Sequence, residues 1–180
     1  INHLGTYKYC AIIISNHMEW IKQIVRLIVV VLLQVLLFDH LQIAGWGFPM
    51  VYVLFLMNMP VQIPRWAEML IGAVVGLVFD VWHSSIGVNM AACVAFSFLR
   101  PILLGNLTQD LERVKGEIYS ASIGRIEYVK CLSILTVVHH LMVFSLEAWS
   151  WHNWWMVLVQ TLISSTLTIL IIMGYDIFRK

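Results

Sequence analysis

Charged residues are scarce in this sequence. Only 12% of its 180 residues are Asp, Glu, Lys or Arg, whereas 61% are hydrophobic, and the mean hydropathy is +0.85. Soluble globular domains contain about 25% charged and about 45–50% apolar residues, so the composition excludes an ordinary soluble domain. A net charge of +1 also leaves no surplus of Lys and Arg for a nucleic-acid-binding face. The sequence therefore predicts an all-α integral membrane protein that binds no nucleic acid.

Paired cysteines and catalytic motifs are also missing. Cys10, Cys93 and Cys131 lie far apart and form no Cys-x-x-Cys pair, which argues against a zinc or redox site. The adjacent His139 and His140 do not have the i, i+4 spacing that a zinc site on a helix uses, so buried, hydrogen-bonded histidines are the preferred interpretation. The sequence contains no Gly-x-Ser-x-Gly, no His-Glu-x-x-His and no P-loop. We expect no enzymatic activity, no metal and no cofactor.

Long apolar runs fill most of the chain. A helix needs roughly 17–25 residues to cross the hydrocarbon core of a bilayer, and polar or Pro-containing breaks divide this sequence into six runs of about that length. We expect a bundle of six transmembrane helices at about residues 21–38, 43–59, 66–83, 86–104, 128–146 and 154–173. In the polar loop 105–127, Leu107, Leu111, Val114 and Ile118 recur as in an amphipathic helix that lies on the membrane or packs against a partner.

The N-terminal residues differ in character from the rest of the chain. The chain begins with Ile1, and Met18 opens a segment typical of the start of a membrane protein. We therefore expect residues 1–17 to be a non-native or disordered extension and residues 18–180 to form a single six-span domain.

The basic residues predict an orientation. If the N-terminus is cytoplasmic, all 11 Lys and Arg residues lie in or beside cytoplasmic segments, which include residues 60–65 and 105–127. The turns on the opposite side, near residues 39–45, 84–85 and 147–153, contain none. Because cytoplasmic loops carry the excess of positive charge, we expect both termini to lie in the cytoplasm.

Ionisable side chains inside the spans are costly and mark candidate sites. Asp80 lies near the outer end of its span and Arg100 near the inner end of the next, so these two side chains cannot pair. Glu68 is the expected partner of Arg100, since both lie near the cytoplasmic side on neighbouring spans. Asp80 has three open interpretations: it caps the adjoining turn, pairs with a histidine such as His83, or carries a transported proton.

Small residues in the third span suggest close helix packing. Gly72-Ala73-x-x-Gly76 is a small-xxx-small pattern, which lets two helix backbones approach each other. The pattern serves either internal packing or a dimer interface, and internal packing is the preferred interpretation.

Two short motifs carry a resemblance to a known family. One is Gly47-Phe48-Pro49-Met50-Val51, a Pro-containing entry to the second span; the other runs from Gly72 to Asp80 and is followed by Ile86-Gly87. On these motifs, and on size and topology, the chain resembles the rod shape-determining protein MreD family of bacterial inner-membrane proteins over roughly residues 20–175. The resemblance implies a fold similar to that of the S-components of vitamin transporters.

The resemblance also implies a function and partners. Such proteins are non-enzymatic subunits of the cell-elongation machinery, which builds peptidoglycan. They bind the bitopic protein MreC and, through it, MreB, RodA and a penicillin-binding transpeptidase. Recognition would occur between helices within the membrane lipid. Pro49, Glu68, Gly72, Gly76, Asp80, Gly87 and Arg100 are the candidate structural or partner-interface residues.

A small-molecule transporter subunit is the alternative. S-components of the same size usually carry Ala-rich small-xxx-small faces on their first span, where they dock to an energising unit. The first span here contains neither Ala nor Gly between Arg26 and Phe38, which favours the scaffold interpretation.

Overall fold

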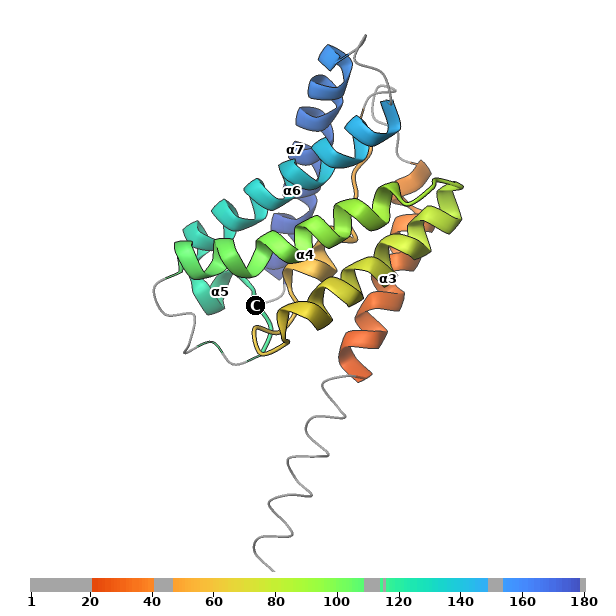
Figure 1. The fold of residues 1–180 in the computed structure, drawn as a ribbon. Helices are drawn as coiled ribbons and strands as arrows, with labels where there is room; N and C mark the ends of the chain where they lie inside the picture. The colour runs from red at the N-terminus through yellow and green to blue at the C-terminus, as the bar shows by residue number, and fades with distance from the viewer. Residues whose placement is uncertain (1–20, 41–46, 109–113, 115, 149–153, 179–180) are drawn as a thin grey trace, which may run out of the picture.

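The computed structural model describes residues 21–40, 47–108, 114, 116–148 and 154–178. Within these residues, five helices are long and apolar enough to cross a membrane: Ile21–His40, α3 (Arg65–His83), α4 (Val88–Leu107), α6 (Arg125–Ala148) and α7 (Trp154–Phe178) (Figure 1). The chain is therefore a helical, multi-pass membrane protein, as its composition predicts. The expectation about residues 1–17 lies outside the described residues.

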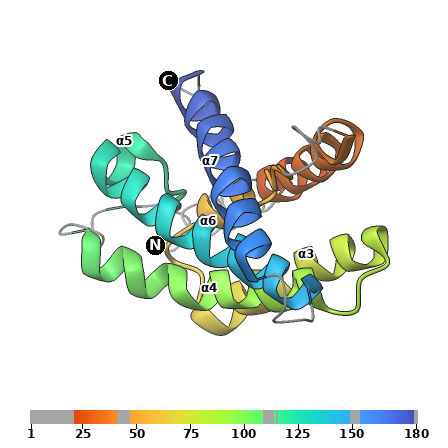
Figure 2. The same ribbon diagram turned by 90° about the horizontal axis from the view of Figure 1, so that it is seen from above.

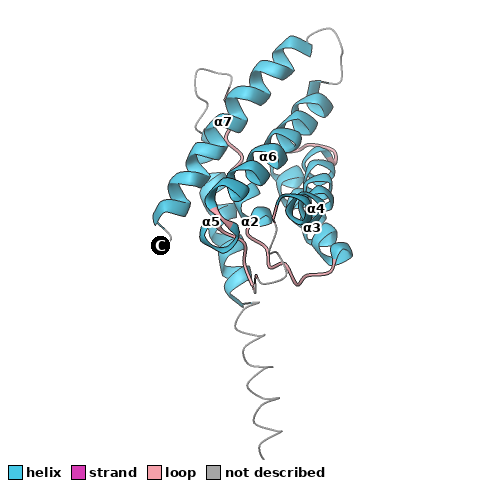
Figure 3. Ribbon diagram, turned by 90° about the vertical axis from the view of Figure 1, so that its left-hand side faces the viewer, coloured by secondary structure: helices cyan, strands magenta, loops and turns pink. Residues whose placement is uncertain are grey.

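The long helices form a bundle in which α4 occupies a central place. It packs against α3 on one side and α6 on the other, and α6 in turn packs against α7 (Figure 2). The described part of the chain contains helices and loops, and the short helix α2 (Val53–Met57) lies among the long ones (Figure 3).

The second predicted span differs from the prediction. Among the described residues of 43–59, only α2 is α-helical, and residues 48–50 have no regular secondary structure. Pro49 lies in this non-helical stretch instead of in the first turns of a helix. The predicted count of six transmembrane helices is thus not reached, because the described residues contain five helices of spanning length.

The chain nevertheless passes from one end of the bundle to the other between the N-terminal helix and α3. The end of the N-terminal helix lies at the end of α3, where Asp39 Oδ2 is 3.2 Å from His83 Nε2. α3 itself begins at its opposite end, at Arg65. Because α3 has 19 residues, Arg65 lies about 28 Å from the end where Asp39 and His83 meet. Residues 47–64 therefore form a partly unwound crossing, which we call the crossing segment.

The middle of the crossing segment lies in the core of the protein. Every residue from Val51 to Met59 is buried, and most of their apolar side chains belong to the largest hydrophobic cluster. Non-helical backbone is tolerated at membrane depth only where protein covers it, and the long helices provide that cover here.

The polar loop before α6 also departs from the prediction. Residues 109–113 and 115 lie outside the described residues, but Val114 and residues 116–119 are not helical, and a four-residue helix, α5 (Ser120–Ile123), comes after them. Ile118 is fully buried in the main cluster. This part of the loop closes one end of the bundle core and does not form the predicted amphipathic surface helix.

Candidate functional site

Side chains of the surrounding helices bond the backbone of the crossing segment. Gln34 accepts a hydrogen bond from Val51 N at 2.7 Å and donates one to the Pro49 carbonyl at 3.1 Å. From α7, Ser164 Oγ accepts from Phe48 N at 3.0 Å, and Thr168 Oγ1 accepts from Met50 N at 3.1 Å. These polar side chains replace the hydrogen bonds that a helix would have supplied, since an unpaired backbone group in hydrocarbon costs several kcal/mol.

Arg100 bonds the backbone at the other end of the crossing segment. Its Nε donates to the Met57 carbonyl at 3.0 Å, and its Nη2 donates to the Met59 carbonyl. Its Nη1 donates to Glu68 Oε1 at 2.6 Å, and both charged side chains are about 98% buried. The Glu68–Arg100 pair that the sequence predicts is therefore present.

The Glu68–Arg100 pair is a fixed part of the core. Removal of one partner from a buried ion pair typically costs about 3–5 kcal/mol, because the other charge is left uncompensated. Arg100 has three acceptors arranged around one planar guanidinium, and a lysine ammonium could not meet all three with the same geometry.

Asp80 caps the next helix, α4. Its carboxylate accepts hydrogen bonds from Ser85 Oγ at 2.6 Å, Asn89 N at 2.8 Å and Met90 N at 2.9 Å. These backbone donors lie in the first turn of α4, where helix N–H groups have no partner in their own helix. Of the three interpretations of Asp80, the geometry favours the cap. His83 pairs with Asp39 instead, and Asp80 and Arg100 do not bond each other.

Three glycines build the α3–α4 hairpin. A Cβ on Gly72 would lie 2.9 Å from the Cys93 carbonyl oxygen, and one on Gly76 would lie 2.6 Å from the Asn89 carbonyl oxygen. Both glycines therefore face α4 within the same chain, as the internal-packing interpretation predicts. Gly87 immediately precedes α4 and has φ +75°, a left-handed conformation that favours glycine.

The two histidines of α6 are buried and bonded. His139 Nε2 lies 3.3 Å from the Tyr52 hydroxyl, which donates to Asn89 Oδ1 at 2.9 Å. His140 Nδ1 lies 2.9 Å from the Thr136 carbonyl, and its Nε2 lies 3.3 Å from Thr168 Oγ1. This is the arrangement that the sequence favours. Within the described residues, no three His, Cys, Asp or Glu side chains are grouped so that they could hold a metal ion.

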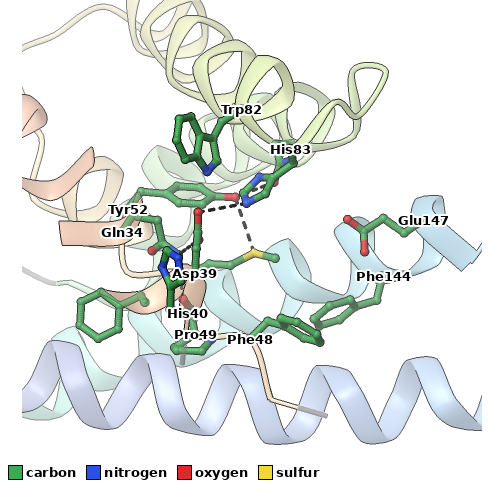
Figure 4. Close-up of a pocket in the computed structure, with 13 residues that line it drawn as sticks. Gln34, Asp39, His40, Phe48, Pro49, Tyr52, Trp82, His83, Phe144 and Glu147 are labelled. Carbon is green, nitrogen blue, oxygen red and sulfur yellow. Dashed lines mark hydrogen bonds and ion pairs between the residues drawn. The ribbon is translucent and has the colours of Figure 1, made fainter. Parts of the chain in front are cut away.

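A cavity of about 390 Å³ opens at the end of the bundle where the N-terminal helix, α3 and α6 terminate (Figure 4). Its charged and imidazole groups come from these three helix ends: Asp39, His40, His83 and Glu147. Aromatic rings form much of the remaining wall: Phe38, Phe48, Tyr52, Trp82 and Phe144. Residues at the start of the crossing segment therefore line both the cavity and, at Tyr52, the buried core.

The sequence predicts the Glu68–Arg100 pair and the close packing at the hairpin glycines. It does not predict which residues bond the backbone of the crossing segment. Gln34 is visible as the one interruption in the apolar run from Leu27 to Leu37, a signal that a polar partner is needed nearby. Ser164 and Thr168 are not distinguishable from the other hydroxyl residues of α7, because a Ser or Thr in a membrane helix can always bond the carbonyl one turn earlier. Both Thr166 and Thr168 do so here.

Comparisons with known proteins identified no similar protein. A scan against models of protein families found no match, and neither did searches of curated proteins and of solved structures.

Proposed function

We propose that this chain is a non-enzymatic subunit of the bacterial cell-elongation machinery. In this proposal it lies in the inner membrane with both termini in the cytoplasm and binds an MreC-like bitopic protein, through which it reaches MreB, RodA and the penicillin-binding transpeptidase. The observation that carries the proposal is the α3–α4 hairpin. Gly72, Gly76, Asp80 and Gly87, which carry the resemblance to the MreD family, all have a defined role in building it.

The exposed helix faces support a role in binding other membrane helices. Only 17% of the most apolar part of the N-terminal helix is buried in the protein, against 44% for α6. Large apolar side chains such as Ile28 and Leu32 on that helix, and Leu162 on α7, are more than half exposed. Association between membrane helices depends on packing and a few hydrogen bonds, and these faces are free to provide the packing.

Copurification tests this proposal. The tagged protein, extracted in a mild detergent, is expected to bring down a single-span protein with a domain outside the cytoplasm. Ile28→Trp and Leu162→Trp change exposed faces of different helices, so both variants should remain folded. Loss of the partner in one variant and not in the other would identify the recognising helix. Recovery of no single-span partner by the folded wild-type protein would contradict the proposal.

A second candidate function is that of an S-component-like subunit for small-molecule transport, and the cavity is the observation in its favour. Ligand sites of this kind are concave, typically about 300–1,000 Å³, and combine apolar walls with a few polar groups. Recovery of an ATP-hydrolysing module in the same copurification would favour this candidate over the scaffold.

A further inference from the structure

Carboxylates and imidazoles are the ionisable groups of the cavity wall among the described residues. Asp39 and Glu147 contribute two carboxylates, and no Lys or Arg is among the described residues that line the cavity. Asp39 is held by Gln34 Nε2 at 2.8 Å and by His83 Nε2 at 3.2 Å. Within the described residues, Glu147 has no hydrogen bond and no ion pair, and Figure 4 shows its carboxylate on the opposite side of the cavity from Asp39. Asp39 thus has His83 as its partner, whereas Glu147 does not have one among the described residues, and a ligand that pairs with Glu147 must carry a positive charge.

The geometry favours an organic cation over a metal ion. A metal site needs several close ligands, and the described residues contain no group of three His, Cys, Asp or Glu that could act together. The wall is instead rich in aromatic rings, with Trp82 on one side of the cavity and Phe48 and Phe144 on another. Aromatic faces attract ammonium groups and are a common means of binding quaternary ammonium ligands.

The position of the cavity indicates where the ligand comes from. Asp39, His83 and Glu147 are each the last or second-last residue of a long helix, so the opening lies at the level where the spans end. Lipid headgroups and water meet at this level. Both a headgroup amine and a soluble amine could therefore enter.

We propose that the cavity binds a molecule with an ammonium group, which pairs with Glu147 and lies against the aromatic wall. The proposal does not depend on the scaffold function, because a partner helix and an ammonium ligand would use different surfaces.

Binding to two probes tests the proposal and separates the two sources. Choline represents a soluble ammonium compound, and phosphatidylethanolamine in nanodiscs represents a lipid headgroup; phosphatidylglycerol, which has no amine, is the negative control. Titration calorimetry measures choline binding, and native mass spectrometry of the full chain counts bound lipid. Saturable choline binding would identify the soluble source, and selective retention of phosphatidylethanolamine would identify the lipid source. If neither probe binds, or if phosphatidylglycerol binds equally well, the proposal is wrong.

A matched pair of variants assigns the binding to the cavity. Glu147→Gln removes one carboxylate that has no bonded partner among the described residues, and it should weaken binding of the active probe about tenfold. Glu127→Gln makes the same chemical change on α6 at the opposite end of the helix and should leave binding unchanged. Equal affinity of the two variants would overturn the assignment to this cavity.

Discussion

At the scale of single residues, the hairpin depends on the absence of side chains at Gly72 and Gly76. These two positions bring α3 so close to α4 that an added Cβ would meet backbone atoms of the neighbouring helix. Backbone cannot move aside as the end of a flexible side chain can, so even one methyl group has to displace a whole helix. The small-xxx-small pattern predicts close packing, and the structure identifies α4 as the partner.

Gly76→Ala is expected to destabilise the protein, by about 1–3 kcal/mol or more, as for other overpacked sites. Gly105→Ala is the matched control, because it lies on α4 with nothing within 4 Å of the new Cβ and should be neutral or slightly stabilising. Thermal unfolding in mild detergent, followed by circular dichroism, compares the two. Equal melting temperatures would show that the close approach at Gly76 is not maintained in solution.

At the scale of elements, the crossing segment is the feature that separates this bundle from a set of six regular helices. Where its backbone does not bond to itself, side chains of the surrounding helices replace the missing hydrogen bonds: those of Gln34, Arg100, Ser164 and Thr168. The segment is therefore only as stable as the helices around it. A segment of this length with Leu, Phe and Val in abundance resembles a membrane helix in composition, and for this reason the sequence predicts one.

Thr168→Val should loosen the start of the crossing segment. The valine has nearly the same shape but cannot accept the hydrogen bond from Met50 N, and an unsatisfied buried donor costs about 1–3 kcal/mol. Faster amide hydrogen exchange is expected in peptides that cover residues 47–52.

Thr166→Val is the matched control for this change. Thr166 is exposed on the same helix and bonds only the Leu162 carbonyl one turn earlier, so exchange at residues 47–52 should not change. If both variants exchange alike, the side-chain bonds of α7 do not hold the crossing segment.

At the scale of the whole molecule, the two ends of the bundle differ in charge. The described Lys and Arg residues lie toward the end where α3 and α6 begin, including Arg65 and Arg125 at their first positions. The other end contains the cavity, the carboxylates of Asp39 and Glu147, and the turn around Ile86. If the positive-inside rule orients this protein, the cavity faces away from the cytoplasm.

Cysteine labelling measures this orientation. Ile86 is 99% exposed at the cavity end and Trp66 is 70% exposed at the basic end, so Ile86→Cys and Trp66→Cys place a thiol at each. In a Cys10→Ser background, a membrane-impermeant maleimide should label Ile86→Cys from outside intact spheroplasts and Trp66→Cys only after lysis. Cys93 and Cys131 are buried and should remain unlabelled. The reverse pattern would contradict the proposed orientation.

The sequence by itself determined the class of the protein, the position of five spanning helices and the Glu68–Arg100 pair. These follow from local apolar length and from the high cost of an unpaired charge in a membrane, both of which can be read along the chain. Only the tertiary structure decided that residues 47–64 cross without a continuous helix and that a cavity opens between three helix ends. Apolar composition shows that a segment is buried, but whether its backbone bonds to itself or to distant side chains such as Gln34 and Arg100 depends on contacts that form only when the helices have packed.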